Sequence, residues 1–225
     1  MKTHPTTCRT ILFFLLGSVL FGQGSSLRKP TLDRDGRFWL YGPGLQGEMP
    51  FSPYAWMPAN AGDFLTMDFS AKPRAEPGRS GAAGTCIAVQ INWQQPYWCA
   101  VAFLSGPDSP SPWWGEDTRG WHFDLSGLPK KKLVVHARGE TGGEKIQIKF
   151  GILGDKKYGD SLPFPAVSDW LTLSKDSKPY ELDLARHKPA DLVRICNGFT
   201  FAVERRLQAG NPAVTRFYID SIYFE

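Results

Sequence analysis

The sequence has little of what marks a disulfide scaffold, a metalloenzyme or a strongly charged partner. Four cysteines in 225 residues are too few for a dense disulfide framework. The 26 basic and 22 acidic side chains leave a formal net charge of +4, so we expect neither a long charged tail nor a nucleic-acid partner. Only four histidines occur. The short motifs of zinc proteases, serine hydrolases and dithiol redox proteins are absent.

Long apolar runs are also scarce, and the one that occurs, Ile11–Phe21, lies near the N-terminus. As a helix rising ~1.5 Å per residue, it would span about half of a ~30 Å bilayer core. Lys2 and Arg9 precede the run and small residues follow it, which is the order of a secretory signal peptide rather than a membrane anchor. We therefore expect residues 1–24 to be a cleaved signal peptide. Residues 25–225 would form a single secreted or periplasmic domain without stable membrane insertion.

Cleavage would leave three cysteines, Cys86, Cys99 and Cys196, so at most one intramolecular disulfide can form. Cys86 and Cys99 lie on strands that we expect to be neighbours. A turn centred between residues 92 and 93 would place these two cysteines opposite each other. The Gln94-Gln-Pro96 pattern favours a later turn that would separate them, and the sequence leaves the bridge open.

Turn-forming and aromatic residues are abundant, with 23 Gly, 18 Pro and 13% Phe, Trp and Tyr. Short strand-like runs recur between the turn residues. In Lys145–Phe150, for example, polar and apolar residues alternate, as expected for a strand with one buried face. The pattern predicts an all-β fold, a two-sheet antiparallel β-sandwich (jelly roll) of about 11 strands. We expect these strands at residues 38–41, 64–69, 85–92, 97–104, 120–125, 132–138, 144–152, 170–173, 180–184, 199–204 and 216–224.

Two connections between these strands have a distinctive composition. Arg138–Glu144 contains three glycines and is interpreted as a hairpin turn between two strong strands. Ala71–Gly84 is rich in Pro, Gly and Arg and is predicted to be an irregular loop. Loops of that length are usually functional or disordered.

Five segments occur in the order Trp113–Glu116, Phe123–Gly127, Leu133–Glu144, Trp170–Leu184 and Phe217–Phe224. Together they resemble segments of the jelly-roll carbohydrate-binding modules with a galactose-binding-like β-sandwich. The last segment is similar to the closing strand of those modules, in which an Asp often precedes an apolar pair. The resemblance covers most of the chain from residue 113 to its end. It implies an exported, non-catalytic domain that binds a polysaccharide or oligosaccharide and requires no cofactor.

A sugar-binding surface needs flat aromatic faces for the apolar side of a pyranose and polar groups for its hydroxyls. Trp113 and Trp114 are the first candidates, because two indoles bracketed by Pro112 and Gly115 cannot easily both enter a core. For each aromatic residue, packing in the core is the alternative. The further aromatic candidates are Trp93, Trp98, Tyr54 and Trp56.

Polar candidates lie on two consecutive expected strands. His136 and Arg138 share one face of the first strand, and Gln147 and Lys149 share the polar face of the second. These groups would contact sugar hydroxyls if the sheet lines a groove, and would otherwise be a solvated sheet face. The resemblance also implies that Asp220 helps to hold a structural calcium ion, with a hydrogen-bonded turn residue as the alternative.

Two other functions stay open at this point. The same sandwich can serve as an exported structural or protein-interaction domain. A glycoside hydrolase or polysaccharide lyase would need paired carboxylates, and Glu116, Glu140, Glu144 and Asp160 are available. We favour binding over catalysis, because carboxylates near glycine turns are usually ordinary surface groups. Exposed aromatic side chains along an open groove would favour carbohydrate, and a groove filled by the chain itself would favour a protein partner.

Overall fold

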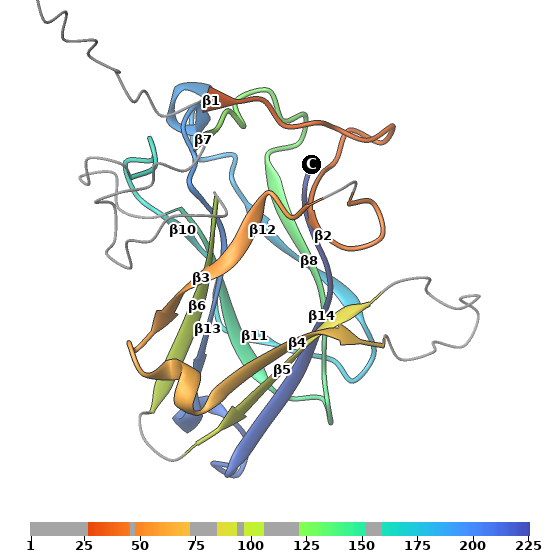
Figure 1. Cartoon of the computed structure of the whole chain (residues 1–225), viewed down its shortest axis with the longest axis vertical. Coiled ribbons are helices and arrows are strands. Elements are labelled where there is room, and N and C mark those ends of the chain that lie inside the picture. Colours follow the sequence, from red (N-terminus) through yellow and green to blue (C-terminus); the bar gives the residue numbers. More distant parts are fainter. Residues whose placement is uncertain (1–26, 46–47, 73–84, 94–96, 106–121, 152–158) are drawn as a thin grey trace, which may run out of the picture.

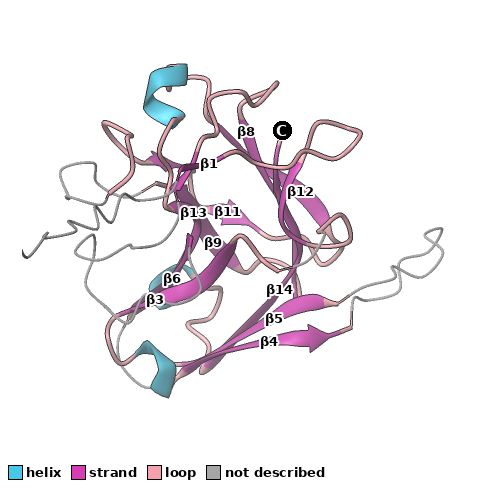
Figure 2. Ribbon diagram, turned by 45° about the horizontal axis from the view of Figure 1, so that its top comes forward, coloured by secondary structure: helices cyan, strands magenta, loops and turns pink. Residues whose placement is uncertain are grey.

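The protein is a sandwich of two antiparallel β-sheets, as the alternation of residues predicted (Figures 1 and 2). The computed structural model describes residues 27–45, 48–72, 85–93, 97–105, 122–151 and 159–225. No helix in these ranges is long and apolar enough to cross a membrane. The strands are β1 (Leu27–Arg28), β2 (Phe38–Tyr41), β3 (Phe51–Met57), β4 (Leu65–Ala71), β5 (Cys86–Asn92), β6 (Trp98–Ser105), β7 (His122–Phe123), β8 (Lys132–Gly139), β9 (Lys145–Phe150), β10 (Ala166–Val167), β11 (Leu171–Thr172), β12 (Lys178–Asp183), β13 (Asn197–Glu204) and β14 (Val214–Phe224). Three short 3-10 helices are described as well: η1 (Ala61–Asp63), η2 (Pro189–Leu192) and η3 (Arg205–Leu207).

Each of the two large sheets has six strands. The sheet that we call the β13 sheet has the order β10-β9-β13-β6-β3, and β11 also pairs with β9. The other, the β14 sheet, has the order β12-β8-β14-β5-β4, and β2 also pairs with β14. A separate parallel pair joins β1 to β7.

The expected strand positions all overlap observed strands, but the sequence did not predict β1, β3 or β10. β3 escaped notice because it contains Pro53, which cannot donate a backbone hydrogen bond. Proline is tolerated at sheet edges and bulges. The structure meets both conditions, since β3 is the edge strand of its sheet and a bulge lies between Pro53 and Ala55.

The expected hairpin at Arg138–Glu144 is wrong. β8 pairs with β12 and β14, whereas β9 pairs with β13, β10 and β11, so this connection carries the chain from one sheet to the other. Gly142 and Gly143 both have positive φ, 82° and 98°, and glycine permits such backbone in either kind of turn. Glycine content alone therefore could not distinguish a hairpin from a crossover.

The same kind of crossover separates β5 from β6, so Cys86 and Cys99 lie in different sheets. The sequence predicted that these two cysteines lie on neighbouring strands, and this prediction is wrong. No disulfide links either of them, or Cys196, to another described residue. The structure therefore favours three thiols over a disulfide between Cys86 and Cys99.

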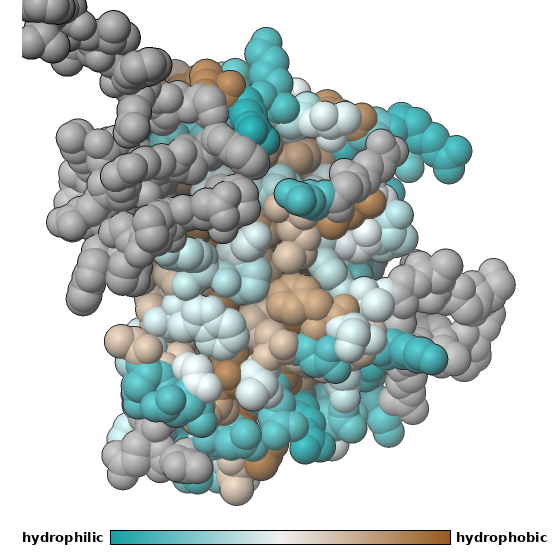
Figure 3. Space-filling view, in the orientation of Figure 1, coloured by the Kyte–Doolittle hydropathy of each residue, from teal (hydrophilic) through white to brown (hydrophobic). Residues whose placement is uncertain are grey.

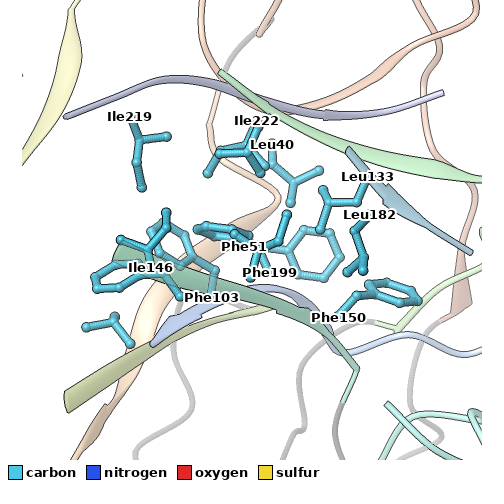
Figure 4. Close-up of a cluster of buried hydrophobic side chains, with 14 of the residues drawn as sticks. Leu40, Phe51, Phe103, Leu133, Ile146, Phe150, Leu182, Phe199, Ile219 and Ile222 are labelled. Carbon is cyan, nitrogen blue, oxygen red and sulfur yellow. The ribbon is translucent and has the colours of Figure 1, made fainter. Parts of the chain in front are cut away.

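The core lies between the two sheets. Figure 4 shows Leu133, Ile219 and Ile222 of the β14 sheet pointing toward Phe103 and Phe199 of the β13 sheet. All five side chains are fully or almost fully buried. Because strand residues alternate between faces, burying one set of side chains turns the intervening set outward. The outward set of the β14 sheet supplies the candidate site.

Candidate functional site

The outward surface of the β14 sheet begins with β8. Leu133, Val135 and Ala137 are completely buried, so His136 and Arg138 point to the opposite, outer side of the strand. These two residues share a face, as the sequence indicated. Figure 3 shows hydrophilic residues gathered over β4 and β5 of the same sheet, in the lower part of the view.

One row of four residues crosses this surface. Arg138 on β8 pairs with Tyr218 on β14, Tyr218 pairs with Ala88 on β5, and Ala88 pairs with Asp68 on β4. Cross-strand partners in a sheet place their Cβ atoms about 4.5–5.5 Å apart and on the same face. Ala88 carries only a methyl group, so it forms a low floor between the longer side chains of Tyr218 and Asp68. We call the surface formed by Arg138, Tyr218, Ala88 and Asp68, with the adjacent Arg216 and Gln90, the β14 face.

The ring of Tyr218 is fixed from two directions. The Cζ atom of Arg138 lies 3.7 Å from the ring centroid, a cation–π contact, and Arg138 itself is only 7% exposed. The Tyr218 hydroxyl donates a hydrogen bond to the Glu140 carboxylate. That bond, followed by burial, raises the pKa of Tyr218 above its usual value. Arg138 and Ala88 are the cross-strand neighbours of Tyr218 on opposite sides, and Tyr218 is half-buried.

Polar groups surround this ring. Arg216 Nε donates a 2.7 Å hydrogen bond to Gln90 Oε1, and Gln90 Nε2 donates to Asn92 Oδ1 at 3.0 Å. On the far side of the floor, Asp68 Oδ1 accepts from the hydroxyl and backbone N–H of Ser70, at 2.6 and 2.8 Å. These two bonds lower the pKa of Asp68. The face therefore presents an ionised carboxylate, an amide and a guanidinium around an aromatic ring.

A second aromatic group lies farther along the same sheet. The ring centroids of Tyr223 and Trp39 are 4.8 Å apart, and the Tyr223 hydroxyl lies 3.4 Å from His136 Nε2. Trp39 Nε1 donates to Asp33 Oδ2 at 2.7 Å. A Cβ atom at Gly44 would lie 2.1 Å from the Trp39 indole, so the backbone of that glycine covers the ring. Trp39 is therefore a packed residue rather than an open platform.

Asp220 is the residue that the resemblance implied as a ligand of a structural calcium ion. The Ser177 hydroxyl donates a hydrogen bond to its Oδ2, while Oδ1 is buried without a partner. The described part of the chain holds no group of three or more His, Cys, Asp or Glu side chains that could bind a metal ion. Calcium takes about six to eight oxygen ligands, among them backbone carbonyls, so the calcium ion at Asp220 stays a prediction. The arrangement at Asp220 is that of a hydrogen-bonded carboxylate.

The other two polar candidates do not join His136 and Arg138. Gln147 and Lys149 lie on β9, and their neighbours Ile146 and Ile148 point into the core. They therefore occupy the outer surface of the β13 sheet, on the other side of the sandwich. Gln147 Nε2 donates to the backbone carbonyl of Ser168 at 2.9 Å. The four residues cannot contact the same sugar unit, because the connection before β9 changes sheets.

The aromatic candidates also separate. Trp93 is 5% exposed and its Nε1 donates to Thr215 Oγ1 at 2.8 Å, so it is a core residue with a satisfied indole and cannot serve as a platform. Trp56 packs against the core and Tyr54 is half-buried. Trp98 is 44% exposed and stays available. Trp113, Trp114 and Glu116 lie outside the described residues.

The sequence analysis did not single out Tyr218, Ala88, Asp68, Gln90 or Arg216. A usable signal existed for part of this set, because Arg216, Tyr218 and Asp220 alternate with apolar residues in the closing strand. Their combination with β5 and β4 could not be predicted, because it depends on the register between strands that are far apart in the sequence.

No protein-family model matches the chain, and no curated protein matches its sequence. Solved structures of family 30 carbohydrate-binding modules are similar in fold. One such module covers 84% of this chain and 86% of its own length at 13% identity, with a TM-score of 0.48. The family 30 module of the cellulosomal cellulase Cel9D-Cel44B of Clostridium thermocellum covers 84% and 96% at 12% identity, with a TM-score of 0.44. Similarity at this level concerns the general outline of the fold, and the function must be argued from this chain's own residues.

Proposed function

We propose that this chain is an exported, non-catalytic domain that binds a polysaccharide or oligosaccharide. The observation that carries the proposal is the β14 face. There a fixed aromatic ring stands beside a low alanine floor, with charged and amide groups around both. Export is supported by the signal-peptide pattern of residues 1–24.

Saccharides are amphipathic in the way that this face requires. The C–H side of a pyranose packs on an aromatic ring, and Tyr218 offers one. Each sugar hydroxyl can donate one hydrogen bond and accept others. Asp68 is an acceptor and Arg216 a donor, and hydrogen bonds to charged groups are stronger than those between neutral ones. The site needs no metal or cofactor for such recognition.

The surroundings of two carboxylates, Asp68 and Asp160, support binding rather than hydrolysis. A glycosidase needs a general acid whose pKa is raised, whereas the pKa of Asp68 is lowered. Asp160 is almost completely buried and accepts hydrogen bonds from the backbone N–H groups of Cys196 and Asn197. It therefore holds the start of β13 in place and is not accessible to a polymer.

A glycan array probed with the secreted protein tests the proposal, followed by isothermal titration of the best soluble hit. Tyr218→Ala removes the platform, and the expected loss is about 5- to 150-fold in affinity, by analogy with the roughly 1–3 kcal/mol measured for nucleic-acid bases stacking on aromatic side chains. Phe164→Ala is the control, because Phe164 is an aromatic residue that is 49% exposed and lies outside the β14 face. Absence of any glycan hit would overturn the proposal, and cleavage of a hit would replace binding with catalysis.

A protein partner is the second candidate. Tyr97 and Trp98 are exposed next to each other at the start of β6, and exposed aromatic residues are common anchors in protein interfaces. The same titration separates the two functions. If Trp98→Ala weakens glycan binding and Tyr218→Ala does not, the sugar site lies at β6. If only Tyr218→Ala weakens it, Tyr97 and Trp98 stay candidates for contact with a protein partner.

A further inference from the structure

We propose that the β14 face binds acidic saccharides, whose carboxylate or sulfate group pairs with the guanidinium of Arg138. The inference rests on the proposed carbohydrate binding and names the class of saccharide that is bound. Two observations carry it. Arg138 is a nearly buried cation that has no anionic partner in the described chain, and it lies against the aromatic ring on which the sugar would pack.

The charge of Arg138 is not compensated by the fold. The residue is only 7% exposed, and its Nε is buried without a hydrogen-bond partner. None of the ion pairs between described residues includes it. A buried cation without a counter-ion costs folding free energy. An anionic ligand therefore accounts for this side chain better than the stability of the fold does.

The contact with Tyr218 leaves the edge of the guanidinium available. Its Cζ lies 3.7 Å from the ring centroid, a separation at which a guanidinium lies flat against a ring. The N–H groups of arginine lie in the guanidinium plane and form a fork that fits two oxygens of one anionic group. Among the Arg138 nitrogens only Nε is both buried and without a partner. The Nη atoms therefore stay within reach of an anion that arrives from solvent.

The carboxylates near this surface, by contrast, already accept hydrogen bonds from the chain itself. Glu140 accepts from the Tyr218 hydroxyl, and Asp68 accepts from the hydroxyl and backbone N–H of Ser70. Asp220 accepts from a serine hydroxyl, and its other oxygen is buried. The surface thus supplies donors for its anions but no anion for its nearly buried cation.

These carboxylates do not prevent an anion from approaching Arg138. Asp68 is on β4, three strands away from β8 in the sheet. At the usual strand spacing this is about 14 Å, which exceeds the ~8 Å screening length at physiological salt. Glu140 is closer, but it is held at the hydroxyl end of Tyr218. Arg216 lines the same pocket as Glu140 and offsets its charge.

An acidic sugar unit carries the two matching chemistries on one ring. Its C–H surface can pack on Tyr218 while its carboxylate or sulfate reaches the neighbouring guanidinium of Arg138. A neutral sugar can satisfy the first contact only. Carboxylates and sulfates both offer a pair of oxygens to the arginine fork, so the experiment must distinguish these two sources of the anionic group.

The test compares charged saccharides with neutral forms of the same backbone, titrated calorimetrically into the secreted protein. The carboxylate probes are tetragalacturonate, tetramannuronate and a hyaluronan tetrasaccharide, each paired with its methyl ester. The sulfate probe is a κ-carrageenan tetrasaccharide, paired with its desulfated form. At least one acid should bind about tenfold or more tightly than its neutral partner. This ratio should shrink as the salt concentration rises from ~0.05 M to ~0.5 M. Equal affinities within every pair would overturn the inference.

A variant assigns the preference to Arg138. Arg138→Met keeps the length of the side chain and removes its charge, so the ratio of acid to neutral affinity should fall about tenfold. Arg194→Met should leave the ratio unchanged, because Arg194 is exposed and lies outside the β14 face. An unchanged ratio in Arg138→Met would contradict the inference.

Nuclear magnetic resonance of the parent protein replaces the variant if Arg138→Met does not fold. The Nε–H resonance of Arg138 should shift when the acid is added and stay in place with its neutral partner. The same shift with both forms, or with neither, would contradict the inference.

The outcomes distinguish this inference from the proposed function. If acidic and neutral forms bind alike and Tyr218→Ala weakens both, the face does not select for charge and carbohydrate binding stands. If every hit on the glycan array is neutral, the inference likewise fails alone. If neither form of any probe binds and the array is also empty, the proposed function fails and the inference fails with it.

Discussion

The two central strands, β13 and β14, have opposite surroundings. Every residue of β13 from Asn197 to Val203 is buried, so the strand is covered on both faces. In β14, by contrast, buried residues alternate with partly or fully exposed ones from Val214 to Asp220. The two sheets share one core, yet only the β14 sheet leaves the outer side of its central strand open. The shared core requires buried residues on the inner face of each sheet, whereas the outer faces of the two sheets can differ in how far they are exposed to solvent.

The largest expected difference between the two sheets follows from placing a charge on the outer side of each. Ala202→Asp in β13 would bury an unpaired carboxylate, and we expect a loss of about 3–5 kcal/mol in the free energy of unfolding. Ala88→Asp on the β14 face should cost less than about 1 kcal/mol. Urea denaturation of both variants measures the difference. Equal losses would show that the two outer faces do not differ in burial.

A smaller effect is expected from the backbone of β13. A Cβ atom at Gly198 would lie 2.7–2.9 Å from three ring atoms of Phe51, and that ring is completely buried. Overpacking of this kind typically costs about 1–3 kcal/mol, so Gly198→Ala should lower the urea midpoint clearly. Gly127→Ala is the control, because no atom lies within 4 Å of its Cβ position. A stable Gly198→Ala protein would mean that Phe51 can move.

The inner and outer sides of the β14 sheet itself give the third comparison. Thr215→Val removes the acceptor of the Trp93 indole N–H, and a buried donor without a partner costs about 1–3 kcal/mol. Thr66→Val changes an exposed residue on the outer side of β4, where the expected change is within about 0.5 kcal/mol. Thermal unfolding of the two valine variants should therefore show a lower midpoint for Thr215→Val alone.

The smallest effect concerns pH. Hydrogen bonds from the Ser70 hydroxyl and backbone lower the pKa of Asp68 from 3.8, so this carboxylate stays ionised at and above that pH. Saccharide affinity should therefore be constant between pH 8 and pH 5 and decline only in stronger acid. Titration calorimetry across this range checks it. A fall in affinity between pH 7 and pH 5 would show that another group controls binding.

The sequence predicted the strands and their faces better than their partners. The alternation of Ile146, Ile148 and Phe150 with polar residues is local, so it identified the inward side of β9 correctly. Whether β9 pairs with β8 or crosses to the other sheet depends on packing that no local pattern contains. The same limit affected Trp93, whose polar neighbours in the sequence suggested exposure. Its indole packs in the core, and Thr215, more than a hundred residues later, accepts the hydrogen bond of its buried N–H.

The burial of the three described cysteines has a consequence for the redox chemistry of the molecule. Burial raises the pKa of the Cys99 thiol to about 12 and also raises those of Cys86 and Cys196. Thiolates are the species that attack disulfides and oxidants, so all three cysteines are poor nucleophiles at neutral pH. No disulfide joins the three described cysteines to one another. We therefore expect these three thiols to react slowly with disulfides and oxidants while the protein is folded.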